Sequence, residues 1–235
     1  MELNNQKRFV FKSTESKRVK FDTFTRYIFA STYVKDKTVL DAACGSGFGT
    51  FFYAQEAKEV VGVDNSIEAI DYAKNNYQRE NIRFINDDLI KTDKLAKNYF
   101  DVIISFHTME QTTDPATFLN KLFDMLKDDG TIILSTQNKR IVSPFIKGTS
   151  LDCNNFDFTK QDLEKLFSNK FNIEWFGQRC TFKPLTWFPV RGVIRLLEKI
   201  LNKKFGFYGA RESYQIAPLK FWQEPKDFIV VLTKR

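Results

Sequence analysis

Residues 39–49 read VLDAACGSGFG, an apolar run that leads directly into closely spaced glycines. A short apolar run bounded by glycines is typical of a buried strand. Glycines at the end of a strand let a ligand approach the backbone, because no side chain stands in the way. The fingerprint of dinucleotide-binding loops is GxGxxG, whereas this loop has the spacing GxGxG. The stretch therefore predicts a strand, a ligand-binding loop and a helix, with a spacing that departs from the dinucleotide pattern.

One acidic residue, Asp41, stands within the end of this predicted strand, just ahead of the glycines. A pyrophosphate is usually held at such a loop by the N-terminus of the following helix, and a carboxylate beside it would repel it. The same carboxylate could hold an ammonium group or orient the amides of the loop. Asp41 therefore favours a cationic ligand over a dinucleotide.

Two further predicted strands also end beside carboxylates. Residues 60–64 read VVGVD, so Asp64 is placed to accept both hydroxyls of a ribose. A strand over 82–85 is followed by the sequence NDDL, in which Asp88 could receive an exocyclic amino group of adenine. Ligands of parallel α/β sheets bind at the carboxyl ends of the strands. Together the three strand ends predict a ligand built from adenosine and an amino acid.

Apolar runs alternate with stretches of helical periodicity along the first 135 residues. The predicted strands span 38–42, 59–63, 82–85, 101–106 and 131–135, and the predicted helices span 49–58, 67–79 and 115–127. This alternation indicates a mostly parallel sheet with helices on both faces.

The chain beyond residue 135 continues this pattern less regularly. A helix is predicted over 159–167, and strands over 171–177 and 228–233. Residues 180–226 contain an amphipathic basic helix over about 190–204 and are interpreted as an elaboration that serves as a lid or as the surface of a homodimer.

The composition excludes several classes of protein. Hydrophobic residues make up 43% of the chain and charged residues 28%, which is typical of a folded globular protein and not of a disordered one. Lys and Arg outnumber Asp and Glu by 36 to 29, and the resulting net charge of +7 favours anionic partners. The excess is spread over the chain instead of lying on one stripe, so nucleic acid is not the expected partner.

Metal binding, disulfides and a membrane span are not expected. The three cysteines, Cys44, Cys153 and Cys180, are far apart, and the chain has one histidine, so neither a zinc site nor a disulfide framework is predicted. The first 20 residues are polar, and no run of about 18 apolar residues occurs. We therefore expect a cytoplasmic protein without a metal.

The glycine loop and the carboxylates that follow it resemble those of the class I S-adenosylmethionine-dependent methyltransferases. The resemblance covers roughly residues 25–178. It implies an α/β, Rossmann-like fold with a seven-stranded, mostly parallel sheet whose last strand is antiparallel, and a C-terminal lid-like elaboration. A single domain over 1–235 is implied, with a helical cover over 1–34, a cofactor-binding core over 35–178 and the last strand at 228–233.

The resemblance implies S-adenosyl-L-methionine as the cofactor. In such a site Asp41 and the glycines lie against the methionine portion, Asp64 binds the ribose, Asp88 and Leu89 frame the adenine, and Tyr27 covers the cofactor. The full set of implied cofactor-binding residues is Tyr27, Asp41, Cys44, Gly45, Gly47, Asp64, Asn65, Asp88, Leu89 and Phe106.

A narrower resemblance is to the methyltransferases of bacterial surface-polysaccharide synthesis. It rests on RYIFA at 26–30, FDVIISFHTME at 100–110 and STQN at 135–138. It implies a small-molecule acceptor, a hydroxyl of a sugar or nucleotide-linked sugar in preference to an amine. The chain departs from this group where a Glu-His pair is usual, because Gln111 follows Glu110.

Methyl transfer to a hydroxyl needs positioning of the reactants and is helped by a base. His107 is the only imidazole of the chain and follows the predicted fourth strand, so it is the leading candidate for the base. Glu110 is the second candidate, as a base or as a hydrogen-bond acceptor for a sugar hydroxyl. Asn138, just beyond the predicted fifth strand, could also reach the acceptor.

Three alternatives stay open at this point. The acceptor could be a quinone-like small aromatic, since the C-terminal aromatic residues could stack on it as well as on a sugar. It could be RNA, although the Pro-Pro-aromatic motif of base-amino methyltransferases is replaced by Ser105-Phe106-His107-Thr108. The chain could also be a catalytically silent interaction partner, a role for which the intact glycines and carboxylates are not needed.

Overall fold

A computed structural model of the chain describes residues 17–142, 157–167, 170–182, 215–221 and 223–235. The basic helix predicted over 190–204 lies outside the described residues, as does Cys153. The described residues fall into two compact units.

The first unit contains the chain up to Ser105 together with Thr117–Ile132. Its elements are α1 (Lys17–Ser31), β1 (Thr38–Ala42), α2 (Phe48–Tyr53), β2 (Glu59–Asp64), α3 (Ile67–Asn76), β3 (Ile82–Asn86), most of β4 (Phe100–Phe106), most of α4 (Pro115–Met125) and the start of β5 (Leu126–Gln137).

The central strand of this unit is β1, which pairs in parallel with β2 on one side and with β4 on the other. Leu40 is the partner of Val61 in β2 and of Ile103 in β4. All five residues of β1 are buried, as expected for a strand inside a parallel sheet. Because β2 and β4 continue the sheet in opposite directions from β1, the carboxyl ends of β1 and β4 form the switch point where ligands of such sheets bind.

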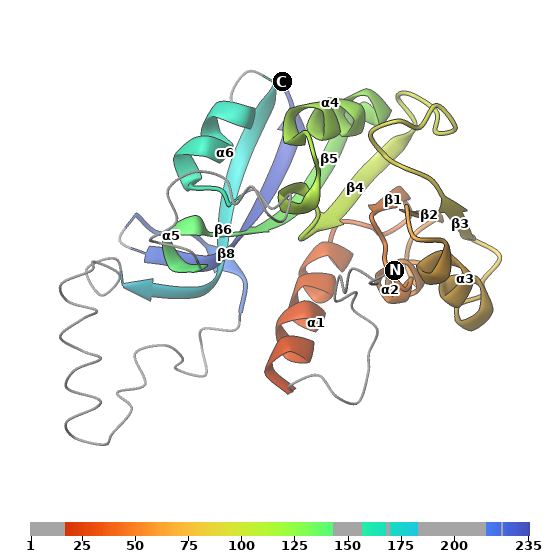
Figure 1. The fold of residues 1–235 in the computed structure, drawn as a ribbon, viewed down its shortest axis with the longest axis horizontal. Coiled ribbons are helices and arrows are strands. Elements are labelled where there is room, and N and C mark those ends of the chain that lie inside the picture. Colours follow the sequence, from red (N-terminus) through yellow and green to blue (C-terminus); the bar gives the residue numbers. More distant parts are fainter. Residues whose placement is uncertain (1–16, 143–156, 168–169, 183–214, 222) are drawn as a thin grey trace, which may run out of the picture. The chain divides into compact units, whose positions relative to one another are not determined.

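The second unit contains Phe106–Ala116 together with the chain from Ile133. Its elements are the short 3-10 helix η1 (Met109–Gln111), α5 (Lys139–Val142), α6 (Lys160–Phe167), β6 (Phe171–Phe182), β7 (Ala217–Pro218), β8 (Gln223–Lys234) and the end of β5. The long strands β6 and β8 run antiparallel side by side, from the pair Phe171 and Lys234 to the pair Phe182 and Gln223 (Figure 1).

The strands hydrogen-bond in the order β3-β2-β1-β4-β5-β8-β6-β7. This order confirms the predicted Rossmann-like α/β fold. Strand β1 pairs in parallel with β2 and with β4, and β2 pairs in parallel with β3. The last strand, β8, is antiparallel to β6. Among the described residues the sheet has eight strands where seven were predicted, because the two residues of β7 add an edge strand to β6. No helix in the described part of the chain is long and apolar enough to cross a membrane.

The boundaries of several elements differ from the sequence prediction. Helix α4 ends at Met125 instead of residue 127, and β5 begins at once at Leu126. The physical reason lies in the loop before β4, where the backbone N–H groups of Asn98 and Tyr99 donate to the carbonyls of Asp124 and Met125 over 2.9 Å each. Another segment thus satisfies those carbonyls, and residues 126–130, which precede the predicted strand over 131–135, become part of β5.

Candidate active site

The glycine loop after β1 has a backbone that only some residues tolerate. Gly45 and Gly47 have φ values of 54° and 84°, in the left-handed region. A Cβ atom at Gly47 would lie 2.6 Å from Cβ of Ala73 and 2.9 Å from the ring of Phe84, so Gly47 is required for the packing of the loop. A Cβ atom at Gly45 would meet nothing within 4 Å. The open side of this loop therefore lies at Gly45.

The carboxylate at the end of β2 holds this loop in place. Oδ2 of Asp64 accepts the backbone N–H of Gly45 over 2.9 Å, and Oδ1 accepts the N–H of Ser66 over 2.9 Å. Ser66 is the N-cap of α3, and its hydroxyl accepts from the N–H of Ala69. Since each carboxylate oxygen can accept more than one hydrogen bond, Asp64 can hold the loop and still receive a ligand hydroxyl.

Asp41 is a buried carboxylate beneath the same loop. Its Oδ2 accepts the hydroxyl of Thr50 over 2.7 Å. Burial raises the pKa of Asp41 to about 7, and the nearby charge of Asp64 adds to the rise, while the Thr50 hydrogen bond opposes it. A cation bound beside Asp41 would favour its ionised form. This group is therefore suited to a positively charged ligand.

Tyr27 reaches the loop from α1. Its ring lies 3.0 Å from the position that a Cβ atom at Gly49 would take, and Oδ2 of Asp41 lies 3.2 Å from that position. Gly49 is thus the glycine that lets the tyrosine and the carboxylate pack against the start of α2. Burial raises the pKa of Tyr27, and the charge of Asp41 raises it further, so the phenol stays protonated. Burial also raises the pKa of the neighbouring Cys44 thiol.

The residues predicted around the adenine are arranged as a turn after β3. Oδ1 of Asp88 accepts the N–H of Ile90 over 2.9 Å, and its Oδ2 lies 3.3 Å from Nζ of Lys91. Leu89 is buried, and Asn65, beside the end of β2, is exposed. The structure thus gives Asp88 a turn-stabilising role, and its contact with a ligand stays a prediction.

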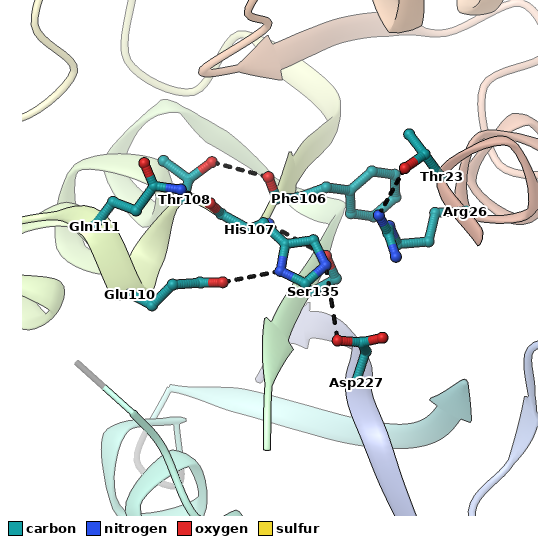
Figure 2. A network of polar contacts seen from close by, with 9 residues as sticks. All are labelled: Thr23, Arg26, Phe106, His107, Thr108, Glu110, Gln111, Ser135 and Asp227. Carbon is teal, nitrogen blue, oxygen red and sulfur yellow. Dashed lines mark hydrogen bonds and ion pairs between the residues drawn. The ribbon is translucent and has the colours of Figure 1, made fainter. Parts of the chain in front are cut away.

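A separate group of polar residues surrounds His107 in the second unit (Figure 2). Nδ1 of His107 lies 2.9 Å from Oε1 of Glu110, and Nε2 lies 3.9 Å from Oδ1 of Asp227. The backbone N–H of His107 donates to the carbonyl of Ser135 over 3.0 Å. The φ value of His107 is 53°, which is uncommon for a residue with a side chain. The two candidate bases, His107 and Glu110, are therefore brought together.

Asp227 is the member of this group that the sequence analysis missed. It is 3% exposed and lies on β8, 120 residues beyond His107. The only signal in the sequence is a single carboxylate directly before the apolar run of the last strand. Its place beside the imidazole depends on which strand β8 pairs with, and a pattern of residues alone does not reveal that.

Asn138, the predicted substrate-binding residue, is fully buried. Its Nδ2 donates to Oε1 of Glu224 over 2.7 Å and to the carbonyl of Pro225 over 2.8 Å, and its Oδ1 accepts the N–H of Arg140. Both amide protons are thus used within the protein, where they tie the end of β5 to the start of β8. Contact of Asn138 with an acceptor stays a prediction.

The described residues line a cavity in each unit. In the second unit a cavity of about 270 Å³ is lined by Arg140, Lys160, Gln161, Glu164, Leu219, Lys220, Phe221, Gln223, Glu224, Pro225 and Phe228. The first unit has a cavity of about 410 Å³ near the end of α3, lined by none of the predicted cofactor-binding residues. The described residues contain no group of three or more His, Cys, Asp or Glu side chains that could hold a metal ion.

Comparison with known proteins places the chain in a family. Residues 34–173 match a family model described as a methyltransferase domain. A probable S-adenosylmethionine-dependent methyltransferase of Mycolicibacterium smegmatis is 31% identical over 108 residues, which are 46% of this chain and 41% of the relative. A ubiquinone biosynthesis O-methyltransferase of Coxiella burnetii is 32% identical over 116 residues, 48% of this chain and 49% of the relative. The match thus spans less than half the length of these relatives.

The fold is also similar to solved structures. An S-adenosylmethionine-dependent methyltransferase from Mesorhizobium loti superposes with a TM-score of 0.58 and 16% identity, over 91% of this chain and 98% of that one. At this level of identity the similarity extends to the fold alone.

Proposed function

Since the chain belongs to the family of methyltransferase domains, we propose that it transfers a methyl group from S-adenosylmethionine to a hydroxyl of a sugar or nucleotide-linked sugar. An amine is the less favoured acceptor. The observation that carries the proposal is the glycine loop, which Asp64 fixes and which is open at Gly45. We further propose that residues 1–235 act as a single methyltransferase domain.

The residues of the first unit fit S-adenosylmethionine. Asp41 offers a buried carboxylate for the ammonium group. Its pKa is raised to about 7, and the positive charge of a bound ammonium group would lower it and favour the ionised form. Gly45 leaves room for a ligand beside the loop. Asp64 has lone pairs left for the ribose hydroxyls, and Leu89 offers a buried apolar surface for the adenine. Tyr27 would close the site from α1.

His107 is proposed as the base, with Glu110 orienting it. S-adenosylmethionine supplies, when bound, a methyl group on a positively charged sulfur, and the carbon–sulfur bond breaks as the acceptor oxygen bonds to that carbon. The hydroxyl proton must then leave. If Nδ1 of His107 donates to Oε1 of Glu110, Nε2 has a free lone pair that can accept this proton. Glu110 would also stabilise the imidazolium that forms.

A nucleotide-linked sugar is supported by the cavity of about 270 Å³ in the second unit. Arg140, Lys160 and Lys220 line it, and guanidinium and ammonium groups are suited to phosphate oxygens. Phe221, which is 83% exposed, lines it as well and offers a ring for stacking. The net charge of +7 agrees with an anionic acceptor.

A quinone-like aromatic is the second candidate acceptor, favoured by the similarity to the Coxiella burnetii protein, whose name is ubiquinone biosynthesis O-methyltransferase. A test is methyl transfer from labelled S-adenosylmethionine to two panels of acceptors, nucleotide sugars and dihydroxybenzoates. We expect transfer to a nucleotide sugar. Transfer to the aromatic panel alone would move the assignment to the second candidate, and binding of S-adenosylmethionine without transfer to either panel would support a silent interaction partner.

A further inference from the structure

Two buried carboxylate oxygens beside His107 have no hydrogen-bond partner among the residues that the structure describes. They are Oδ1 of Asp227 and Oε2 of Glu110. Asp227 is 3% exposed and Glu110 is 9% exposed, so bulk water does not readily replace a partner. A buried acceptor without a donor is unfavourable, so each such group in a native structure calls for an explanation, and a catalytic or binding role is one of them.

The imidazole of His107 does not supply the missing donor to Asp227. Nε2 of His107 and Oδ1 of Asp227 are 3.9 Å apart, which is too long for a direct hydrogen bond (Figure 2). When Nδ1 donates to Glu110, Nε2 presents a lone pair, and two hydrogen-bond acceptors then face each other. Among the described residues no side chain donates to Oδ1 of Asp227, so hydroxyls of a bound acceptor are suited to supply the donors.

We propose that His107 and Asp227 together bind a vicinal diol, two hydroxyls on neighbouring carbons of the acceptor. One hydroxyl donates to Nε2 of His107, loses its proton to that nitrogen and gains the methyl group, while its neighbour donates to Oδ1 of Asp227 and keeps its proton. The inference rests on the proposed function and names its acceptor class. A single hydroxyl has one proton and would leave one of the two acceptors unmet.

Asp227 is thus a substrate-binding residue, and it also selects which hydroxyl reacts. Binding of the neighbouring hydroxyl by Asp227 fixes the orientation of the reacting one at His107, and such positioning contributes much of the rate of a displacement. Sugars and dihydroxyaromatic compounds both contain vicinal diols. The same chemistry therefore covers both proposed acceptors, and an experiment has to separate them.

The single histidine of the chain provides a direct probe, because its ring signals in an NMR spectrum belong to His107 without assignment. The protein, saturated with S-adenosylhomocysteine, is titrated with methyl mannoside and its monodeoxy analogues, and with 3,4-dihydroxybenzoate and the two monohydroxybenzoates. We expect one of the two diols to shift the ring signals and to bind at least tenfold more tightly than its single-hydroxyl analogues. The diol that does so shows whether the acceptor is a sugar or a dihydroxyaromatic compound.

Asp227→Asn is the test variant, and Asp227→Ala is a second one with a different effect on packing. Both should remove the tenfold preference for the diol, whereas Asp124→Asn, at an exposed aspartate paired with Lys97, should keep it. Three results would each overturn the inference: equal binding of diol and single-hydroxyl compounds, no shift of the ring signals by either diol, or an unchanged preference in the Asp227 variants. If the unmodified protein does not bind S-adenosylhomocysteine, the result contradicts the proposed function instead.

Discussion

At the scale of single residues, the carboxylates of the two units differ in their hydrogen bonds and burial, although all of them lie near the ends of predicted strands or next to one. Asp64 fixes the glycine loop through two backbone amides, whereas Asp41 is buried with a pKa raised to about 7. Glu110 and Asp227 border the single imidazole. The sequence predicted Asp41, Asp64 and Glu110 from their positions after strands. It could not predict the burial that raises the pKa of Asp41.

The raised pKa of Asp41 predicts that stability falls as the pH rises. Its pKa is about 7 in the folded protein against an ordinary value of 3.8, so the folded state binds the proton more tightly. The stabilisation by protonated Asp41 is complete below about pH 4 and is lost as the pH rises through 7, by at most about 4 kcal/mol. Urea unfolding between pH 4 and 8 should show this slope.

Asp41→Asn should flatten that slope and raise the stability at pH 8, while Asp124→Asn should leave it unchanged. The same Asp41 variant should bind S-adenosylmethionine more weakly, because the ammonium group loses its carboxylate. An Asp41→Asn protein that keeps both the slope and the affinity would show that the carboxylate serves neither purpose.

The two glycines of the loop should respond differently to alanine. Gly47→Ala places a Cβ atom 2.6 Å from that of Ala73, so we expect a loss of several kcal/mol in the free energy of unfolding. In Gly45→Ala the added Cβ atom clashes with nothing, so we expect a loss of only about 1 kcal/mol in the free energy of unfolding, from the strain of the positive φ. The Gly45 variant should nevertheless lose affinity for S-adenosylmethionine. Unfolding and binding measured on both variants check this contrast, and equal losses of stability would contradict it.

At the scale of elements, the first strands were predicted closely, whereas β5, β6 and β8 are each at least five residues longer than predicted. The strand over 38–42 was placed to the residue, because its apolar run is bounded on both sides. Helix α2 was predicted over 49–58 but ends at Tyr53. The start of β5 was missed because the backbone carbonyls of Asp124 and Met125, just before it, accept hydrogen bonds from the loop before β4. These boundaries depend on contacts between distant segments, which local periodicity does not contain.

Asn138 is expected to be a structural link between the end of β5 and the start of β8. Asn138→Ala would remove two hydrogen bonds from Nδ2 and leave the buried carboxylate of Glu224 without that donor, a loss of about 2–4 kcal/mol. Asn76→Ala, at an exposed asparagine that bonds to the carbonyl of Tyr72, should cost far less. Thermal unfolding of the two variants compares these costs. A negligible effect of Asn138→Ala would return this residue to acceptor binding.

At the scale of the whole molecule, the order of strands and the family agree with what the residues predicted. The glycine loop, Asp64 and the turn after β3 could be predicted in this order because they follow one another along the chain. Two of the three members of the group around His107 were predicted, and the third, Asp227, was missed because it lies on the last strand. The sugar acceptor was predicted from the narrower resemblance alone, because the residues proposed to recognise it come from separate parts of the sequence.

The variants of His107 and Glu110 test the proposed chemistry as a whole. His107→Ala should lower the rate of methyl transfer by about 100-fold or more, in the range of general base catalysis, while leaving the affinity for S-adenosylhomocysteine unchanged. Glu110→Gln should lower it less, because the imidazole keeps a hydrogen-bond partner. Near-normal turnover of His107→Ala together with loss of turnover in Glu110→Gln would move the base to Glu110.

The central claim is that the loop held by Asp64 binds S-adenosylmethionine, and calorimetric titration of the chain with this compound and with its demethylated product tests it most directly. We predict dissociation constants near micromolar, about −8 kcal/mol, with a loss of at least 100-fold in Asp64→Ala and no change in Asp124→Asn. Absence of binding to both compounds, or unchanged affinity in Asp64→Ala, would contradict the claim.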